Sequence, residues 1–395
     1  MKPGGNTCDI FCTVVDNYGD IGVSWRLARQ LANEHGMAVR LWVDELTSFA
    51  RLCPAVDAML DAQYQQAVEV RRWPAEFPPV EPAALVIEAF ACRLPQRYEA
   101  AMAARVDKPV WINLEYLTAE DWVEGCHRLP SPHPTLPLTK YFFFPGFTPR
   151  TGGLLLERDL LARRDAFQAD AAAQAVFWRG LGVPERQPGE LRVSLFSYEN
   201  EALEALLSAW ELGTQPVVCL LPEGRALPQV EQYFGHAGRA SARQAGLKPD
   251  PQVYARGNLR VQVLPFVEQS QYDELLWACD INFVRGEDSC VRAQWAARPF
   301  VWHIYPQHDG VHRAKLEALR ARYAAGLPAD AAAAVRDVWL AWNGGAGIDR
   351  AWPRYVAEQE RLARHGRDWA QRLSGNNLAL NLLSTLNRNV RFPAK

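Results

Sequence analysis

The segment Asp16–Gly22 carries two carboxylates four residues apart, between a short apolar run and an amphipathic stretch. A glycine-containing turn from a strand into a helix can project both Asp16 and Asp20 toward a ligand. Carboxylates in such a place can orient a basic group and accept a proton from it. A structural alternative stays open, in which Asp20 only caps the following helix and Asp16 forms an Asx turn.

A second loop with chemical potential is Arg285-Gly-Glu-Asp-Ser289, which follows another apolar run and precedes a helical segment. Ser289 or Asp288 can cap that helix. The unpaired N–H groups and the dipole at a helix start attract an anion such as a diphosphate, and Arg285 would add a charged contact. The alternative is that Glu287 and Asp288 are ordinary first-turn acids of a helix.

Aromatic and amide side chains follow two further apolar runs. Phe196 and Tyr198 come after one of them, and Phe266 and Gln269 come after another. Aromatic rings at strand ends can sandwich a nucleobase, and a glutamine can hydrogen-bond its edge. Ordinary packing of the rings is the alternative.

Three of the eight histidines fall within the segment His303–His312. A metal site through His308 and His312 is one interpretation. Neighbouring loop histidines more often have structural or solvent-facing roles, so we expect no metal.

The elements that must position these loops follow a simple pattern, in which short apolar runs alternate with amphipathic helical segments. This pattern is typical of parallel sheets covered by helices. In the first helix Val23, Leu27 and Leu31 recur every four residues, and Gly36 stands where a C-cap belongs. The expected strands are Cys8–Val15, Val39–Val43, Ala84–Glu88, Val110–Asn113 and Tyr141–Phe144 in the first half, and Leu191–Phe196, Val217–Leu221, Val261–Leu264, Ile281–Val284 and Phe300–His303 in the second.

The second half repeats the architecture of the first, with helices expected at Glu201–Trp210, Tyr272–Ala278 and Val291–Ala297. A chain of 395 residues also exceeds what one hydrophobic core usually organises. We therefore expect two α/β domains. Residues 158–182 are predicted to be helical, and the long polar stretch 224–258 is predicted to be helical or a mobile insertion.

The composition restricts the function. Lysine and arginine number 43 and aspartate and glutamate 45, for a net charge of −2, so a nucleic-acid partner is not expected. No apolar stretch approaches the roughly 20 residues that span a bilayer, and no segment near the start resembles a signal core. The eight cysteines are scattered without a C-x-x-C pair, which predicts reduced thiols and a cytoplasmic protein.

Three long blocks together resemble one family, the bacterial protein-arginine rhamnosyltransferases that modify elongation factor P. The blocks are CTVVDNYGDIGVSWRLARQL, SLFSYEN and LPFVEQSQYDELLWACDINFVRGEDSCVRAQWAARPFVWHIYPQ. The resemblance extends over most of the chain between Cys8 and about residue 315. The alanine-rich tract that follows and the C-terminus are less diagnostic.

The resemblance implies a GT-B fold, with two Rossmann-like α/β domains facing each other across a cleft. Residues 1–183 would form the acceptor-binding domain and 184–365 the nucleotide-sugar-binding domain, with a C-terminal helix within 366–395, roughly Trp369–Leu386, packing back on the first. The donor would be dTDP-β-L-rhamnose, the acceptor an arginine of elongation factor P, and the reaction would invert the anomeric configuration without a metal or cofactor. We expect the first domain to dock the acceptor.

The family pattern also implies roles for individual residues. Asp20 is the expected general base, Asp16 would orient the guanidinium or support Asp20, and Glu287 is the third essential acid. The positions that match nucleotide-sugar contacts are Phe196, Tyr198, Phe266, Gln269, Arg285, Asp288, Ser289 and Tyr305.

Other functions remain as alternatives. One is a GT-B sugar transferase with a different acceptor, and another is a non-catalytic protein that only binds elongation factor P. A nicotinamide-dependent dehydrogenase is less favoured, because the first loop has Gly19-x-x-Gly22 but lacks G-x-G-x-x-G.

Overall fold

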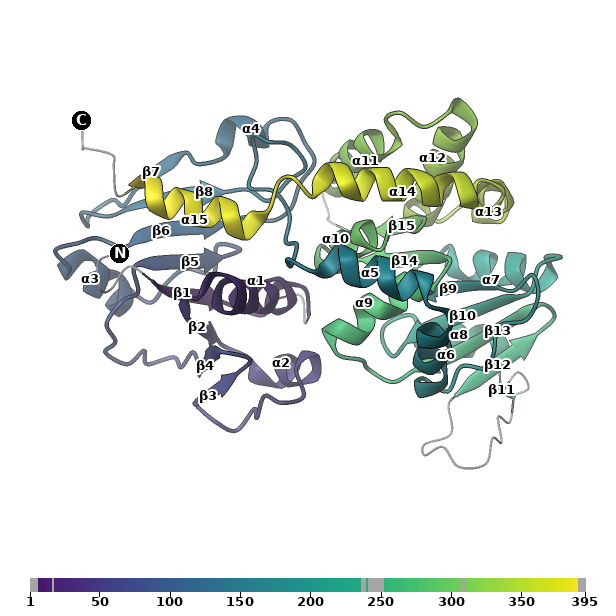
Figure 1. Ribbon diagram of the computed structural model, residues 1–395, viewed down its shortest axis with the longest axis horizontal. Coiled ribbons are helices and arrows are strands. Elements are labelled where there is room, and N and C mark those ends of the chain that lie inside the picture. Colours follow the sequence, from purple (N-terminus) through teal and green to yellow (C-terminus); the bar gives the residue numbers. More distant parts are fainter. Residues whose placement is uncertain (1–5, 16–17, 236–238, 241–251, 307–309, 390–395) are drawn as a thin grey trace. The chain divides into compact units, whose positions relative to one another are not determined.

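The computed structural model describes residues 6–15, 18–235, 239–240, 252–306 and 310–389 (Figure 1). The chain divides into two compact units, residues 1–158 with 373–395 (unit 1) and residues 159–372 (unit 2). The division falls before the predicted boundary at 183/184 because two helices, α5 (Leu160–Ala169) and α6 (Ala171–Gly180), pack on unit 2. Trp178 of α6, for example, lies in one hydrophobic cluster with Val218 and Leu220.

Unit 1 is built on an eight-stranded sheet whose strands are β1 (Thr7–Cys12), β2 (Ala38–Val43), β3 (Ala62–Gln65), β4 (Val68–Arg72), β5 (Leu85–Ala89), β6 (Val110–Leu114), β7 (Pro130–Pro132) and β8 (Thr139–Phe143). Their order across the sheet is β3-β4-β2-β1-β5-β6-β8-β7. The six central strands are parallel, and β3 and β7 are antiparallel edge strands. The five predicted strands of this half are confirmed, whereas the two edge strands and β4 were not predicted.

The order of the strands reverses at β1. The chain first builds outward through β2 and β4, and it later returns to place β5 on the other side of β1. The topological switch point of unit 1 therefore lies between β1 and β5. Loops at the carboxyl ends of strands beside such a point form the usual ligand crevice of open α/β sheets.

Helices cover both faces of this sheet; they are α1 (Gly19–His35), α2 (Leu46–Leu52), α3 (Gln96–Ala104), α4 (Val123–Cys126) and α15 (Leu378–Asn389) (Figure 1). Apolar side chains of α1 and α15 pack on one face, together with Ile10 and Ile87 of the central strands. Tyr98 of α3 packs with Phe11 on the other face. Gly36, with φ of 62°, ends α1 as the predicted C-cap.

The predicted C-terminal helix, roughly Trp369–Leu386, is divided into two helices, and the part that packs on unit 1 is the second of them, α15. α14 (Gln359–Leu373) ends before a Ser-Gly-Asn-Asn sequence, and α15 begins after it. The backbone of this break pairs with Leu154, whose N–H donates to the Asn376 carbonyl and whose carbonyl accepts from Leu378 N–H. The interruption follows because glycine and asparagine are weak helix formers and the backbone groups find partners outside a helix.

Unit 2 contains a second sheet, with strands β9 (Leu191–Leu195), β10 (Val217–Pro222), β11 (Arg239–Ala240), β12 (Val253–Arg256), β13 (Leu259–Leu264), β14 (Ile281–Arg285) and β15 (Phe300–His303). Their order is β11-β12-β13-β10-β9-β14-β15, so the switch point lies between β9 and β14. The five predicted strands are confirmed. The stretch 224–258, predicted to be helical or an insertion, contributes α8 (Leu227–Phe234) and the antiparallel strands β11 and β12.

The remaining helices of unit 2 are α7 (Leu203–Leu212), α9 (Gln269–Ala278), α10 (Asp288–Trp295), α11 (Val311–Ala324), α12 (Ala329–Gly344) and α13 (Ile348–Ala357). The three helices predicted between the strands correspond to α7, α9 and α10. Both α9 and α10 begin about one turn earlier than predicted. The connection between each helix and the strand that precedes it is therefore short. This early start brings the first turns of α9 and α10 to the carboxyl edge of the sheet.

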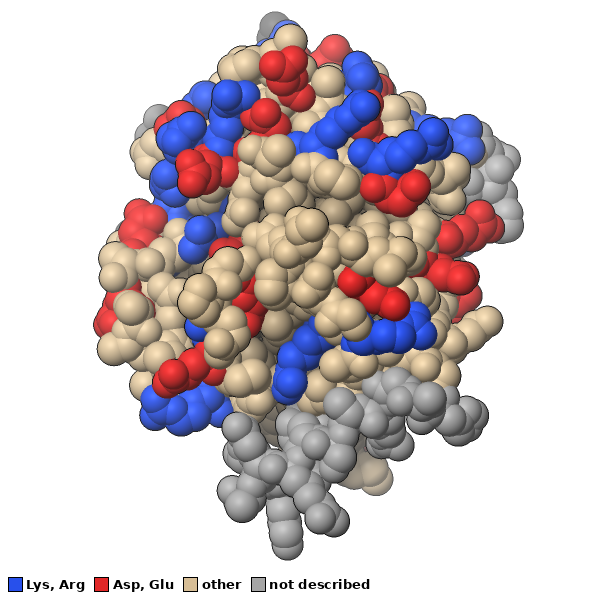
Figure 2. Space-filling view, turned by 90° about the vertical axis from the view of Figure 1, so that its right-hand side faces the viewer, with Lys and Arg blue, Asp and Glu red and all other residues tan. Residues whose placement is uncertain are grey.

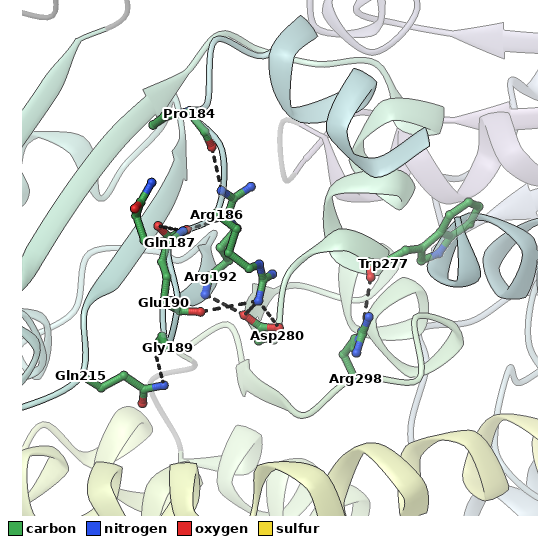
Figure 3. A network of polar contacts seen from close by, with 10 residues as sticks. All are labelled: Pro184, Arg186, Gln187, Gly189, Glu190, Arg192, Gln215, Trp277, Asp280 and Arg298. Atoms are coloured by element: carbon green, nitrogen blue, oxygen red, sulfur yellow. Dashed lines mark hydrogen bonds and ion pairs between the residues drawn. The ribbon is translucent and has the colours of Figure 1, made fainter. Parts of the chain in front are cut away.

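A polar network lies at the other end of the strands of this sheet, where β9 and β14 begin (Figure 3). The Asp280 carboxylate accepts from Arg186 Nη1 at 2.8 and 3.0 Å and from the backbone N–H of Arg192 at 2.7 Å. The buried Arg192 guanidinium donates to Glu190 Oε1 and to the Pro184 carbonyl, both at 2.7 Å. These groups join the amino ends of β9 and β14, so we assign them a structural role.

Surface and thiol chemistry agree with an ordinary globular chain. Basic and acidic groups lie interspersed among the described side chains on the face shown in Figure 2. All eight cysteines are free, and six of them are buried. Within the described residues no helix combines the length and apolar character needed to cross a membrane.

Candidate functional site

The first candidate loop lies at the switch point of unit 1, between β1 and α1. Asp20 sits in the first turn of α1 and is 3% exposed, and its Oδ2 accepts a hydrogen bond from Val15 N–H at 3.0 Å. The N-cap residue is Tyr18, so the reading of Asp20 as the cap is wrong. Asp16 lies outside the described residues. The Asp20 carboxylate is therefore fixed by the loop that leaves β1, and the helix dipole favours its negative charge.

A second carboxylate holds the same loop. Asp44, directly after β2, accepts from Val14 N–H at 2.9 Å. Burial raises the pKa of the Cys12 thiol at the end of β1 well above its ordinary value, and the charges of Asp20 and Asp44 act in the same direction. The carboxyl end of β1 is thus a negative environment, which suits a cationic ligand.

At the switch point of unit 2, between β9 and β14, the buried charged side chain is a cation. The Arg285 side chain is 8% exposed, and its Cζ lies 4.3 Å from the Phe196 ring centroid and 4.7 Å from that of Tyr198. Its Nη1 also donates to the Ser197 carbonyl at 3.3 Å. Phe196 and Tyr198, predicted as a nucleobase sandwich, thus both contact the Arg285 guanidinium. The loops after β9 and β14 are joined in this way across the switch point.

The Arg285–Ser289 loop is closed by its own side chains. Ser289 Oγ accepts from Arg285 N–H at 3.1 Å and donates to the Arg285 carbonyl. Gly286 has φ of 64°, and its carbonyl accepts from Trp302 Nε1 at 2.7 Å. The N-cap residue of α10 is Glu287, without a side-chain capping bond, so the predicted capping by Ser289 or Asp288 is wrong.

The other predicted donor residues lie around this core. The Tyr305 ring, 51% exposed, lies 5.3 Å from Tyr198. Gln269 is buried and begins α9, and Phe266 is half-buried in the loop that follows β13. In the sheet β10 lies between β13 and β9. Phe266 and Gln269 therefore follow a strand that does not neighbour the two strands, β9 and β14, beside the Arg285 cluster.

Sequence reasoning missed the place of His303. It is the last residue of β15 and pairs in register with Arg285 of β14. Its ring, 5% exposed, lies 5.4 Å from Tyr198 and 5.8 Å from Trp342, and its Nδ1 has no hydrogen-bond partner among the described residues. Burial, aided by the Arg285 charge, lowers its pKa from 6.5 to about 4. Strand register, which the sequence alone does not supply, brings this neutral imidazole beside the cluster.

The described residues contain no group of three or more histidine, cysteine or acidic side chains arranged to hold a metal ion. His308, one of the two histidines considered as ligands, lies outside the described residues. The absence of a metal therefore stays a prediction.

The fold and the loops at the two switch points define a class. A glycosyltransferase structure from Rickettsia africae aligns over 98% of this chain and 99% of the Rickettsia chain, with a TM-score of 0.52 and 10% identity. This similarity shows a shared fold. A structure concerned with EarP-mediated arginine glycosylation of translation elongation factor EF-P covers 97% and 99%, with a TM-score of 0.66 and 39% identity. The architecture is that of the GT-B glycosyltransferases.

Sequence comparison gives the family. A family profile described as "Elongation-Factor P (EF-P) rhamnosyltransferase EarP" matches residues 8–387. A protein-arginine rhamnosyltransferase of Pseudomonas putida is 53% identical and one of Pseudomonas aeruginosa 52%, with 93% and 92% of this chain and 94% and 93% of those proteins covered. The chain belongs to the EarP family and is an enzyme of the protein-arginine rhamnosyltransferase class.

Proposed function

We propose that the chain transfers L-rhamnose from dTDP-β-L-rhamnose to one arginine side chain of elongation factor P, with inversion at the anomeric carbon. Unit 2 takes the donor and unit 1 the acceptor. The family match over residues 8–387 supports the acceptor and the sugar. The single structural observation that carries the mechanism is the buried Asp20 carboxylate, fixed by Val15 N–H at the switch point of unit 1.

The donor assignment is supported by charge. The start of α10 presents backbone N–H groups and the positive end of a helix dipole, which favour a diphosphate. Arg285 adds a fixed positive charge, and its near-complete burial strengthens its field. These groups stabilise the charge that develops on the departing nucleoside diphosphate, so the proposal includes no metal and no cofactor.

The remaining donor residues complete this proposal. Phe196 and Tyr198 lie against the Arg285 guanidinium and hold it in place, and the half-exposed Tyr305 ring beside Tyr198 offers apolar surface to the base or sugar. The other matching positions are Phe266, Gln269, Asp288 and Ser289. A carboxylate repels a diphosphate, so we assign Glu287 to the sugar hydroxyls.

The acceptor is a guanidinium, which is protonated at neutral pH and is a poor nucleophile because its lone pairs are delocalised. Removing the proton in advance would cost roughly 8 kcal/mol, since the pKa lies about six units above neutral. We therefore propose that the proton leaves during or after attack. One nitrogen forms a bond to the anomeric carbon, the bond from that carbon to the diphosphate oxygen breaks, and the nitrogen's proton passes to Asp20. Asp16 is proposed to orient the guanidinium.

We propose that the reaction takes place in the cytoplasm. The eight free cysteines fit a reducing compartment, where thiols stay unpaired.

The test is intact-mass analysis of elongation factor P after incubation with the chain and dTDP-rhamnose in the presence of a chelator. A gain in mass of one deoxyhexose would support dTDP-rhamnose as donor, elongation factor P as acceptor and metal independence together. Retention of activity only without the chelator would contradict the metal-free mechanism. No mass gain, with dTDP binding shown by calorimetry, would contradict the acceptor assignment.

A further inference from the structure

The switch point of unit 1 is flanked by two loops, and the loop after β1 leads to the proposed base, Asp20. The other is Phe90–Arg93, which follows β5. The Cys92 thiol donates to the Phe11 carbonyl at 3.3 Å, so this loop packs against the end of β1. Beyond that end, the loop leaving β1 donates from Val15 N–H to the Asp20 carboxylate. The loop after β5 and the proposed base thus share one edge of the sheet.

The backbone of this second loop is strained. Phe90, Ala91 and Arg93 each have φ of 56°, a left-handed conformation that residues other than glycine rarely adopt. Each such residue costs free energy of folding, and strain of this kind gathers at functional sites. A turn formed by three non-glycine residues therefore points to a role beyond joining β5 to α3.

Two buried side chains impose the strained conformation. Glu88 Oε1 accepts from Arg93 N–H at 3.0 Å, and Asn113 Oδ1 accepts from Ala91 N–H at 3.2 Å. Both side chains are 1% exposed, and Glu88 also binds Lys140 at 2.9 Å. The conformation is thus fixed by partners within the sheet.

The strained turn presents an aromatic surface. The Phe90 ring stacks on Tyr116, which lies just past the end of β6, with centroids 4.7 Å apart and planes 21° from parallel. Tyr116 is 39% exposed and Phe90 is half-buried. Two stacked rings, partly open to solvent, therefore stand at the same sheet edge as Asp20.

We propose that Phe90 and Tyr116 bind and position the acceptor arginine of elongation factor P. Planar guanidinium groups stack on aromatic faces, where the negative quadrupole of the ring attracts their charge. The stack would hold the guanidinium in a fixed plane while Asp20 receives its proton. This inference rests on the proposed function, and it adds a surface that recognises the arginine itself.

The experiment measures initial rates of rhamnosylation at varied elongation factor P concentration, for the unsubstituted chain and for Tyr116→Leu and Phe90→Leu. We expect the KM for elongation factor P to rise about two- to thirtyfold for each substitution, the range of cation–aromatic contacts. The stack exists in both the ground and the transition state, so kcat at saturating acceptor should change little. Calorimetric affinity for dTDP should be unchanged.

Tyr116→Phe keeps the ring and should keep the KM of the unsubstituted chain. Tyr64→Leu is the matched control, because Tyr64 is a 73% exposed ring on the edge strand β3 of the same sheet. A KM unchanged from the parent in both leucine variants overturns the inference, because even the weakest such contact should raise KM about twofold. If Phe90→Leu lowers both kcat and the melting temperature, that variant has lost its fold, and the KM of Tyr116→Leu alone tests the inference. No transfer by the unsubstituted chain overturns the proposed function itself.

Discussion

The two units place opposite charges at equivalent points of the same architecture. In each sheet the first strand of the unit, β1 or β9, lies beside a strand that the chain adds after reversing direction, β5 or β14. In unit 2 the loops at this point enclose the Arg285 cation between two rings. In unit 1 they hold the Asp20 carboxylate and leave the Phe90–Tyr116 rings stacked on each other.

This difference matches the two proposed substrates. An anionic diphosphate requires fixed positive charge, and the aromatic faces of unit 2 already contact a guanidinium of the protein. A cationic arginine requires a carboxylate and aromatic faces, and unit 1 offers both. One topology thus supplies two complementary sites through the side chains that follow its central strands.

The largest expected effect tests the carboxylate of unit 1. Asp20→Asn keeps the size of the side chain and removes the proton acceptor, so we expect kcat for rhamnosylation to fall by about 10²- to 10⁴-fold. Intact-mass time courses on elongation factor P measure the rate, and dTDP calorimetry serves as the control for unit 2. A rate within tenfold of the parent would show that Asp20 is not the base.

The second prediction concerns the neutral histidine beside the cation of unit 2. The folded pKa of His303, about 4, lies below its unfolded value of 6.5, so its contribution to stability is complete above about pH 6.5 and falls away toward pH 4. The depression corresponds to roughly 3 kcal/mol in total, of which about 2 kcal/mol is lost by pH 5.

His303→Gln should therefore narrow the difference in melting temperature between pH 7.5 and pH 5. His312→Gln, on α11, is the control. An equal narrowing in the two variants would contradict the assignment to His303.

The sequence revealed the charged loops more readily than the aromatic one. Asp20 and Arg285 follow strongly apolar runs, and a glycine stands beside each, so strand periodicity and turn chemistry were sufficient to select them. The Phe90–Arg93 turn contains no glycine, and its shape depends on Glu88 and Asn113, whose partnership requires β5 and β6 to be paired. Local patterns carry no signal for such a turn.

The same limit applied to the fold. The central parallel strands other than β4 were predicted from their apolar runs, whereas β4 carries three charged residues among five, and the antiparallel edge strands β3, β7 and β11 are short and contain no apolar run. His303 was noticed only as part of a histidine-containing segment, since its register with Arg285 is a tertiary fact. Family resemblance supplied the residue roles, which neither spacing nor composition could assign.

A smaller effect should separate the shape of the Arg285 cation from its charge. Arg285→Lys keeps the charge but loses the plane that lies against Phe196 and Tyr198, so dTDP affinity should fall about tenfold. Arg256→Lys is the matched control, because that guanidinium lies 4.4 Å from the Tyr233 ring and 5.5 Å from Phe234 near the far edge of the same sheet. Calorimetry should show parental affinity for the control. Parental affinity in Arg285→Lys would show that charge alone suffices.

The smallest expected effects come from the backbone of the loop after β5 in unit 1 and of the loop after β14 in unit 2. Ala91→Gly relieves a left-handed residue after β5 and should stabilise unit 1 by about 0.5–1 kcal/mol, once the greater entropy of glycine in the unfolded chain is subtracted. Gly286→Ala introduces the same strain after β14 and should destabilise unit 2 by about 1–2 kcal/mol. Urea unfolding followed by hydrogen exchange in each unit measures both changes. Opposite signs would establish that unit 1 maintains strain where unit 2 uses glycine, and destabilisation by Ala91→Gly would remove the strain argument for the aromatic surface.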